Sequence, residues 1–175
     1  MQNILERAAR IELVIFDVDG VLTDGSLFLG DDGQEYKAFH SRDGHGIKML
    51  QNCGVRCAII TGRTSRVVEH RIRNLGIAPE LVFQGQHDKL SAFGKLLETA
   101  ALTPEQTAYV GDDVVDLPVM RRVGLAIAVQ DAHPWVLRHA HWQTPHGGGR
   151  GAARDVCELL MEARGVLTRE LETYL

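Results

Sequence analysis

Short apolar runs alternate along the chain with longer segments in which apolar residues recur at helical spacing. The runs are rich in Val, Ile, Leu and Ala, which is typical of strands buried on both faces of a sheet. They span residues 13–16, 55–60, 81–83, 107–110 and 125–129. The intervening segments predict helices near residues 43–50, 65–74, 88–97 and 113–122, with Asp43 and Asp88 as N-caps.

This alternation of strands and helices predicts crossover connections and a parallel sheet. The expected fold class is therefore α/β, a Rossmann-like three-layer sandwich with a mostly parallel sheet. A length of 175 residues suits a single domain over residues 1–175, with a core at about 11–164 and a tail at 165–175.

Two further features flank the alternating region. Residues 26–29 and 35–39 surround Gly30-Asp31-Asp32-Gly33, which is a hairpin signal, so we expect a small β-hairpin flap. The last part of the chain predicts a short helix at His133-Pro134, an edge strand at His141-Trp142, a glycine loop at 147–151 and a helix at 155–163.

Composition and charge narrow the possible partners. An apolar fraction of 45% with 24% charged residues is ordinary for a globular protein, and a net charge of −4 gives no general affinity for nucleic acid. No 18-residue apolar run indicates a membrane span. The chain has 15 Arg against four Lys, which points to anionic ligands. Cys53, Cys57 and Cys157 show no disulfide or metal spacing, which predicts a reducing, cytoplasmic location.

Polar residues that follow three of the predicted strands are candidate functional residues. Asp17 and Asp19 follow the first strand, Thr61 follows the second, and Asp112 and Asp113 follow the fourth. Open parallel sheets bind ligands outside the carboxyl ends of their strands, so these side chains are expected to converge. Two neighbouring carboxylates at a buried strand end are costly unless a cation or hydrogen bonds compensate them, which favours a chemical role.

Simpler explanations of single residues stay open at this point. An EF-hand calcium loop that started at Asp17 would need a closing Glu where the chain has Phe28, and an Asp pair that only caps a turn is a second alternative. His139 and His141 lack a third ligand at metal-site spacing, so a structural or surface role is expected for them. The glycine loop lacks the strand and lysine context of a nucleotide-binding P-loop.

Four motifs together resemble the haloacid dehalogenase superfamily of phosphohydrolases. They are Asp17-Val18-Asp19-Gly20-Val21-Leu22-Thr23-Asp24-Gly25, Ile60-Thr61-Gly62-Arg63, Lys89 on a later helix, and Gly111-Asp112-Asp113 with Asp116. Each motif is weak alone, but all four occur in the expected order on the expected elements, over about residues 11–130. The resemblance implies phosphoryl transfer from a phosphate monoester.

The resemblance assigns catalytic roles to matching residues. Asp17 would attack phosphorus and form an aspartyl-phosphate, which divides one difficult step into two. Asp19 would protonate the leaving alcohol and then take a proton from the attacking water. Thr61, the Gly62 amide and Lys89 would hold the phosphoryl oxygens.

The resemblance also implies a metal site. Asp17, Asp112 and the backbone carbonyl of Asp19 would hold Mg²⁺, for which Mn²⁺ or Co²⁺ could substitute. Asp113 would orient the lysine or a metal-bound water. Asp116 is explained equally well as an ordinary helix residue.

Spacing indicates the capless subclass of the superfamily. The flap and one helix account for the residues between Asp17 and Thr61, and one helix and one strand account for those between Thr61 and Lys89, so no cap domain fits. Capless members commonly oligomerise. The resemblance therefore implies a homotetramer in which a neighbouring subunit covers the active site.

Within that subclass the chain resembles phosphatases that act on the 8-phosphate of an eight-carbon sugar acid in lipopolysaccharide sugar synthesis. The likeness runs to about residue 165. We expect Arg63, Arg150 and Arg154 to bind the substrate carboxylate, some of them across a subunit interface. The alternatives are a nine-carbon sialic-acid-type 9-phosphate or another small sugar phosphate and, more remotely, a non-catalytic metal-binding interaction module.

Overall fold

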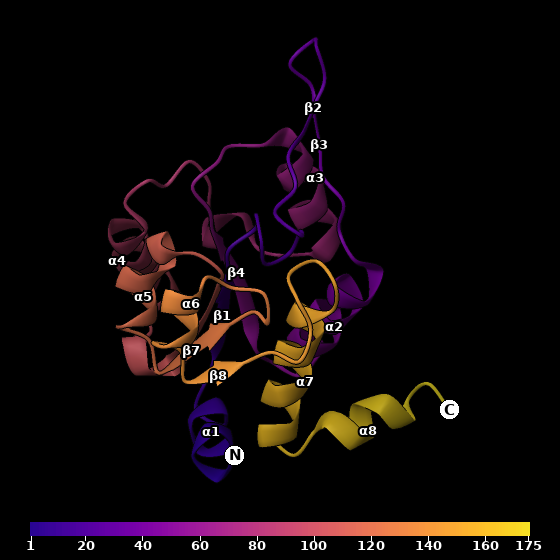
Figure 1. Ribbon diagram of the computed structural model, residues 1–175. Coiled ribbons are helices and arrows are strands. Elements are labelled where there is room, and N and C mark those ends of the chain that lie inside the picture. Colours follow the sequence, from indigo (N-terminus) through magenta and orange to yellow (C-terminus); the bar gives the residue numbers. More distant parts are fainter.

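The computed structural model describes residues 1–175 and contains a six-stranded parallel sheet with helices on both faces (Figure 1). The strand order is β5-β4-β1-β6-β7-β8, and every neighbouring pair is parallel. The strands are β1 (Leu13–Phe16), β4 (Arg56–Ile60), β5 (Val82–Phe83), β6 (Thr107–Gly111), β7 (Leu125–Ala128) and β8 (Trp142–Gln143). The predicted α/β fold is confirmed.

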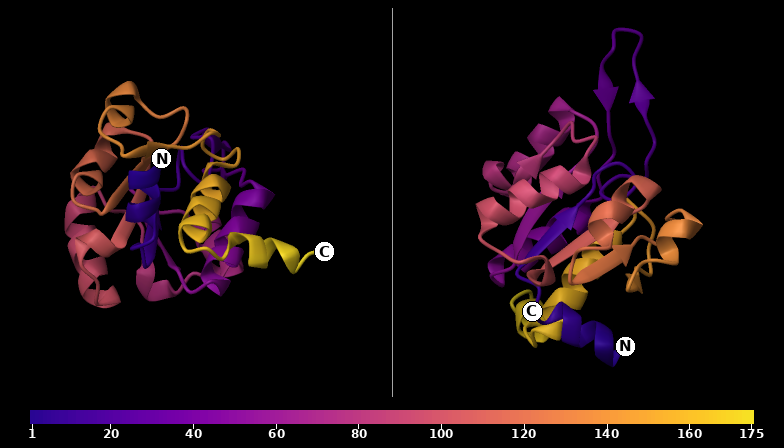
Figure 2. Two further views of the ribbon diagram at one scale, coloured as in Figure 1. Left: turned by 90° about the horizontal axis from the view of Figure 1, so that it is seen from below. Right: turned by 90° about the vertical axis from the view of Figure 1, so that its left-hand side faces the viewer.

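The connecting helices form layers on the two faces of the sheet (Figure 2). On one face α2 (Ser41–Asn52) packs along α7 (Ala152–Ala163), and α1 (Gln2–Ala8) contacts α7. On the other face α4 (Lys89–Ala100) packs against α5 (Leu117–Met120). The remaining helices are α3 (Arg66–Leu75), α6 (Pro134–Leu137) and α8 (Leu167–Glu172), with 3-10 turns η1 (Pro79–Leu81), η2 (Pro104–Gln106) and η3 (Val114–Asp116). None of the helices is both long and apolar enough to cross a membrane.

Strand β1 lies in the middle of the sheet because all of its side chains are apolar. Its four residues are fully buried and pair with β4 on one side and with β6 on the other. The chain leaves β1 toward β4 and later returns to the other side of β1 at β6, so the strand order reverses there. Loops that leave adjacent strands at such a point diverge and form a crevice. The residues that follow β1, β4 and β6 therefore surround one crevice.

Local signals set the ends of the helices near this crevice. Ser65 caps the start of α3, and Gly76 ends that helix in the left-handed conformation with φ of 71°. Asp88 caps α4 as predicted, because its carboxylate accepts the backbone N–H of Ser91 at 3.0 Å. The helix predicted after Asp113 is shorter than expected and consists of η3 followed by α5.

The prediction that Asp43 caps α2 is wrong. Helix α2 begins at Ser41 with His40 at its N-cap, and Asp43 is buried in its first turn. The carboxylate of Asp43 instead accepts the backbone N–H of Arg154 at 2.9 Å, near the start of α7. Burial raises the pKa of Asp43, and this hydrogen bond opposes that shift. The carboxylate thus joins two adjacent helices, and α7 starts three residues earlier than the predicted Asp155.

The predicted hairpin flap is present and projects from the carboxyl edge of the sheet (Figures 1 and 2). Its strands β2 (Phe28–Leu29) and β3 (Glu35–Tyr36) are antiparallel. The flap carries four exposed large side chains, which retain between 48% and 64% of their accessible surface: Leu27, Phe28, Leu29 and Tyr36. This apolar surface is not covered by the rest of the chain.

The glycine loop, residues 147–151, packs against the loop that follows β1. The amide of Gly149 donates to the carbonyl of Val21 at 2.9 Å, and a Cβ at Gly148 would overlap the carbonyl oxygen of Gly20. Only glycine permits so close an approach of two backbones. The glycine loop therefore supports the loop that follows β1.

The tail forms α8, which contacts α7, and the ring of Tyr174 packs edge-on against His45 of α2 at 5.3 Å between ring centres.

Candidate active site

The side chains that follow β1 and β6 meet at the carboxyl edge of the sheet, as their positions suggested. The carboxylate of Asp17 is almost fully buried, and its Oδ1 accepts the backbone N–H of Val18 at 2.7 Å. Its Oδ2 lies 2.8 Å from Nζ of Lys89, the first residue of α4. One oxygen each of Asp17, Asp112 and Asp116 lie within 4.8 Å of one another. Two of these carboxylates, on Asp17 and Asp116, thus share one buried ammonium group, and Asp112 lies beside them.

Strand β4 brings Thr61 and Gly62 to the same edge. Thr61 is buried one residue beyond the end of β4, and the parallel register with β1 places it beside the loop that contains Asp17. The backbone of Thr61 donates to the carbonyl of Phe83 at 2.9 Å and accepts from the amide of Gln86 at 3.0 Å. These hydrogen bonds fix the turn that carries Thr61 and Gly62.

Asp116 is the candidate that the sequence alone did not resolve. It is fully buried, and its Oδ1 accepts hydrogen bonds from Nζ of Lys89 at 2.6 Å and from the Tyr109 hydroxyl at 2.7 Å. Its Oδ2 accepts the backbone N–H groups of Asp112 and Asp113 at 3.0 and 3.2 Å. Both oxygens therefore hold parts of the site in place. The sequence feature that indicates this role is the position of Asp116 one turn after Asp112. A carboxylate at that position can accept hydrogen bonds from the backbone amides at the end of the strand.

Asp113 does not make the contact with Lys89 that we expected. Its carboxylate caps η3 by accepting the backbone N–H of Val114 at 2.7 Å. The carboxylates that contact Lys89 belong to Asp17 and Asp116. The turn after β6 thus directs the later carboxylate to the lysine, and an action of Asp113 on a metal-bound water stays a prediction.

Burial and mutual repulsion change the acidity of the cluster. Burial, followed by the charges of Asp116 and Asp17, raises the pKa of Asp112 from 3.8 to about 8. Burial and the charge of Asp116 raise the pKa of Asp17 to about 6, although Lys89 opposes this shift. Burial alone would lower the pKa of Lys89, but the charges of Asp17 and Asp116 raise it. One lysine therefore compensates the carboxylates only in part, which favours a bound cation.

The donor atoms of the cluster fit a hard divalent cation, since Asp17 and Asp112 both present carboxylate oxygens to the same space. Asp112 lies directly against Gly20, where a Cβ would overlap its Oδ2. Gly20 also has a φ of 88°, which strains any other residue. A glycine at this position lets the loop after β1, which contains Asp19, approach the carboxylate of Asp112.

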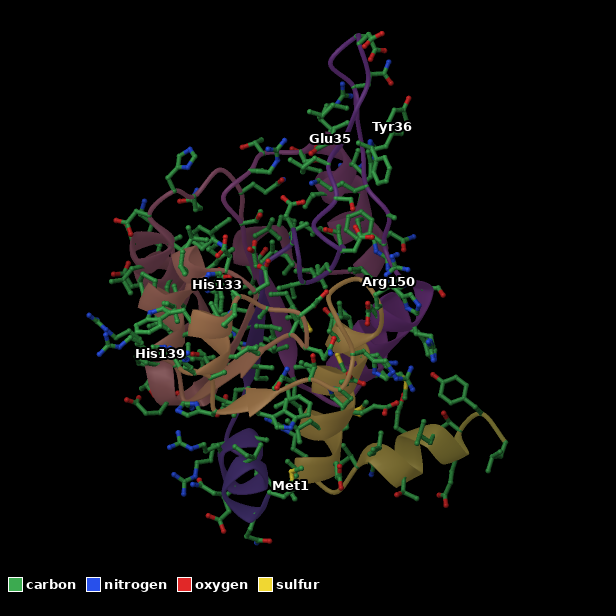
Figure 3. All side chains as sticks on the ribbon, viewed as in Figure 1. Met1, Glu35, Tyr36, His133, His139 and Arg150 are labelled. Carbon is green, nitrogen blue, oxygen red and sulfur yellow. The ribbon has the colours of Figure 1, made fainter.

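The flap brings Lys37 to Asp19 and Glu35 to Lys37, and the sequence analysis missed both of these charged residues. Lys37 has a fully enclosed side chain, forms an ion pair with Oδ1 of Asp19 and lies 3.0 Å from Oε1 of Glu35. Arg63 places Nε 3.9 Å from Oδ2 of Asp19 and Nη2 3.4 Å from Oε1 of Glu35. Glu35 lies on the flap beside Tyr36, as Figure 3 shows. Charges of alternating sign thus connect the flap to the loop after β1.

The two arginines of the C-terminal part have other partners. Nη2 of Arg150 lies 3.1 Å from Asp24, and Nε of Arg154 lies 2.6 Å from Glu158 (Figure 3 labels Arg150). Of the three arginines predicted to bind substrate, Arg63 alone contacts Asp19 within this chain. A contribution of the other two to substrate binding stays a prediction.

His139 and His141 have separate backbone partners and do not form a metal pair. Nδ1 of His139 is hydrogen-bonded with the carbonyl of Trp135 at 2.7 Å, and Nδ1 of His141 accepts the amide of Ala126 at 2.9 Å. These contacts agree with the expected structural role.

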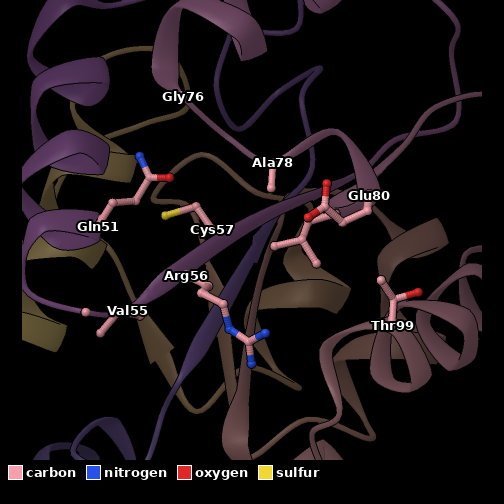
Figure 4. A pocket seen from close by; sticks show the side chains of 10 residues that line it. Gln51, Val55, Arg56, Cys57, Gly76, Ala78, Glu80 and Thr99 are labelled. Carbon is pink, nitrogen blue, oxygen red and sulfur yellow. The ribbon is translucent and has the colours of Figure 1, made fainter.

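Two hollows differ in their relation to the carboxylates. The one in Figure 4 has a volume of about 290 Å³ and lies at the amino-terminal end of β4, beside Val55 and Arg56, away from Asp17. The other has a volume of about 650 Å³ and lies between the flap and the start of α3. Its lining includes Glu35, Arg66 and His70, and it adjoins Arg63. Its lining is mostly polar, and it includes Glu35, which pairs with Lys37 and Arg63.

Comparison with known proteins identifies related sequences. A family model described as haloacid dehalogenase-like hydrolase matches residues 79–154. The chain is 50% identical over 165 residues to the 3-deoxy-D-manno-octulosonate 8-phosphate phosphatase KdsC of Salmonella typhi, and this match covers 94% of the chain and 87% of that protein.

Solved structures of phosphatases also superimpose on this chain. The 3-deoxy-D-manno-octulosonate 8-phosphate phosphatase of Moraxella catarrhalis, in complex with a magnesium ion, a phosphate ion and a KDO molecule, superimposes with a TM-score of 0.96 at 37% identity, covering 100% of this chain and 99% of that one. The cobalt-bound deoxy-D-mannose-octulosonate 8-phosphate phosphatase of Haemophilus influenzae superimposes with a TM-score of 0.90 at 39% identity, covering 95% and 99%.

Proposed function

The chain belongs to the haloacid dehalogenase-like hydrolases and is a phosphatase of sugar-acid phosphates, and on that premise we propose that its substrate is 3-deoxy-D-manno-octulosonate 8-phosphate. The products are the free sugar acid and phosphate, as a step of lipopolysaccharide sugar synthesis. The observation that carries the proposal is the convergence of Asp17, Lys89 and Asp112 in a chain that is half identical to a phosphatase of this ester. The expected phosphatase class is confirmed, while the individual substrate is the proposed part.

Asp17 is the proposed nucleophile. Its carboxylate is held at both oxygens, by the amide of Val18 and by Lys89, so its orientation toward phosphorus is set before substrate binds. Attack by an oxygen of Asp17 forms an aspartyl-phosphate and breaks the bond between phosphorus and the ester oxygen. Lys89, Thr61 and the Gly62 amide hold the phosphoryl oxygens during both steps.

Asp19 is the proposed general acid and base. It lies two residues after the nucleophile and is partly exposed at the base of the flap, where the leaving alcohol departs. In the first step its carboxyl gives a proton to the leaving oxygen, and in the second its carboxylate takes a proton from the water that attacks phosphorus. The second step regenerates Asp17 and releases phosphate.

Magnesium is the proposed cofactor, held by the carboxylates of Asp17 and Asp112 and by the backbone carbonyl of Asp19, with cobalt or manganese as substitutes. Relatives crystallised with magnesium and with cobalt support this assignment. When bound, the cation neutralises charge on the transferring phosphoryl group. Asp116 serves the site differently, because its oxygens already accept hydrogen bonds from Lys89, Tyr109 and two backbone amides.

Asp116→Asn is expected to lower kcat by about 100-fold with a small change in KM, because an amide can no longer pair with the Lys89 ammonium. Steady-state kinetics on purified protein check this result. Tyr109→Phe is the graded control, because it removes a single hydrogen bond to the same carboxylate. It should lower kcat by about tenfold or less. Equal activity of Asp116→Asn and the wild type would contradict the role of Asp116 in holding Lys89.

A substrate panel tests the proposed reaction. We expect kcat/KM for 3-deoxy-D-manno-octulosonate 8-phosphate to exceed that for a nine-carbon sugar-acid 9-phosphate and for a hexose 6-phosphate by at least about 100-fold, or about 2.7 kcal/mol. A chelator should abolish all turnover, and added Mg²⁺ should restore it. Equal values of kcat/KM across the panel would contradict the substrate assignment. Turnover in the presence of chelator would contradict the proposed requirement for a metal ion. Binding of metal without turnover of any ester would favour the interaction module.

A homotetramer in which a neighbour covers the crevice is the proposed assembly. It is supported by the exposed apolar side chains of the flap, which the rest of the chain leaves uncovered. Phe28→Lys is expected to dissociate the assembly in sedimentation-velocity measurements, because the introduced charge would lose its hydration at an interface. Val115→Lys, a charge placed on another exposed apolar side chain, is the control. An unchanged sedimentation coefficient for Phe28→Lys would contradict a flap-mediated interface.

The remaining proposals concern organisation and location. The buried apolar residues form one contiguous cluster, which supports a single domain over residues 1–175. Three free cysteines, Cys53, Cys57 and Cys157, support a reducing, cytoplasmic environment.

A further inference from the structure

The ion-pair network between the flap and Asp19 suggests a role for Lys37, a residue outside the four motifs. Its side chain is fully enclosed although the flap itself projects into solvent. Burying a lysine is costly unless carboxylates compensate it, and Lys37 has two, on Asp19 and on Glu35. As with Lys89 in the carboxylate cluster, carboxylates compensate this buried lysine, and here one of them belongs to the proposed general acid.

We propose that Lys37 is a positioning residue that holds the carboxyl group of Asp19 toward the leaving oxygen, an inference that rests on the proposed phosphatase function. Lys37 contacts Oδ1 of Asp19, while Oδ2 faces the side that Arg63 occupies at 3.9 Å. One oxygen is therefore held by the ammonium group, and the other lies on the side of Arg63. Glu35, at 3.0 Å from the ammonium group, keeps Lys37 in place and offsets its charge.

The contact also gives the flap a function in the reaction. Glu35 belongs to β3, and Lys37 is the first residue after that strand. The position of the flap therefore determines the position of the Lys37 ammonium group. A flap that is displaced would withdraw Lys37 from Asp19 and release the general acid. Glu35 also lines the hollow between the flap and the start of α3, so a group bound there would touch the residue that keeps Lys37 in place.

The dependence of rate on the leaving group tests the proposal, because an aryl phosphate with an acidic phenol needs little protonation whereas a sugar phosphate needs a general acid. For Lys37→Met we expect the single-turnover rate of phosphoryl transfer to fall about 50-fold with the eight-carbon sugar phosphate and less than about threefold with p-nitrophenyl phosphate. Lys37→Arg should recover part of the loss. Glu35→Gln should show the same selectivity with a smaller loss. Lys48→Met, on the exposed side of α2, is the matched control and should behave as the wild type.

A double-variant cycle separates positioning from other roles. If Lys37 acts through Asp19, then Lys37→Met should cause no further loss in an Asp19→Asn background. Equal losses with both esters, multiplicative losses in the double variant, or a higher KM for the sugar acid with unchanged kcat would each overturn the proposal, the last by showing direct binding of substrate. Wild-type protein that hydrolyses neither ester with Mg²⁺ would instead overturn the phosphatase function itself. Sedimentation and thermal melting of each variant confirm that assembly and fold are retained.

Discussion

Asp17→Asn is expected to lower kcat by at least about 10³-fold while the protein stays folded, since the substitution removes the nucleophile and one proposed carboxylate ligand of Mg²⁺. The amide oxygen of asparagine can still accept the hydrogen bond from Val18, and Lys89 keeps its pairing with Asp116. The loss should therefore appear in chemistry rather than in stability. Steady-state kinetics with Mg²⁺ and thermal melting measure the two effects separately.

The covalent step gives this prediction a second readout. Acid quenching of wild-type protein during turnover, followed by mass spectrometry, should reveal one added phosphoryl group on the peptide that contains Asp17. The Asp17→Asn protein should show none. Glu98→Gln, on an exposed part of α4, is the control for removal of a carboxylate and should retain both turnover and the adduct. Substantial turnover by Asp17→Asn, or a phosphoryl group on another residue, would contradict the mechanism.

The sequence was sufficient to predict the sheet and the acidic residues because both depend on local patterns. Strand β1 is an apolar run buried on both faces, and the residues that follow it must lie at the carboxyl edge of a parallel sheet. The sequence alone therefore predicts that Asp17, Thr61 and Asp112 lie close together. The resemblance of the motifs then supplied the chemistry, and the comparisons confirmed the family.

Residues whose roles depend on tertiary contacts could not be predicted in this way. Lys37 reaches Asp19, and Glu35 reaches Lys37, only through the tertiary position of the hairpin, and no periodicity encodes that approach. Asp43 looked like a helix cap by composition, but its partner is an amide of a helix more than a hundred residues later. The local sequence indicates which groups at a helix end need a hydrogen-bond partner. Tertiary packing determines which partner each of these groups has.

Asp112→Asn is expected to combine a large loss of activity with a gain in stability of the metal-free protein. The carboxylate would bind Mg²⁺, so kcat/KM should fall by at least about 10³-fold. The same carboxylate is unfavourable without a cation, because burial and the charges of Asp116 and Asp17 raise its pKa from 3.8 to about 8. Asparagine removes that ionisation, and at pH 8 in chelator the variant should be more stable by about 2 kcal/mol.

The pH dependence gives the sign of this effect. Between pH 4 and pH 8 the folded state of the metal-free wild type binds more protons than the unfolded state, because the folded pKa of Asp112 is about 8. Its stability should therefore be greatest at the acidic end of this window and decrease as pH rises toward 8, and the shift of Asp17 to about 6 acts in the same direction. In Asp112→Asn the decrease should be smaller. Urea denaturation at several pH values in chelator measures both slopes.

Added Mg²⁺ should reverse the order of the two proteins, and that reversal is the strongest test of the site. A cation that binds only the folded state stabilises the wild type by about 2.7 kcal/mol at a concentration 100 times its Kd. Asp112→Asn loses a ligand and should gain far less, so the wild type becomes the more stable protein. Asp113→Asn, which keeps an acceptor for Val114, is the neighbouring control and should retain the response to Mg²⁺. If Asp112→Asn melts below the wild type in chelator at pH 8, charge repulsion in the carboxylate cluster is not a source of instability; if it still responds fully to Mg²⁺, Asp112 does not bind the metal.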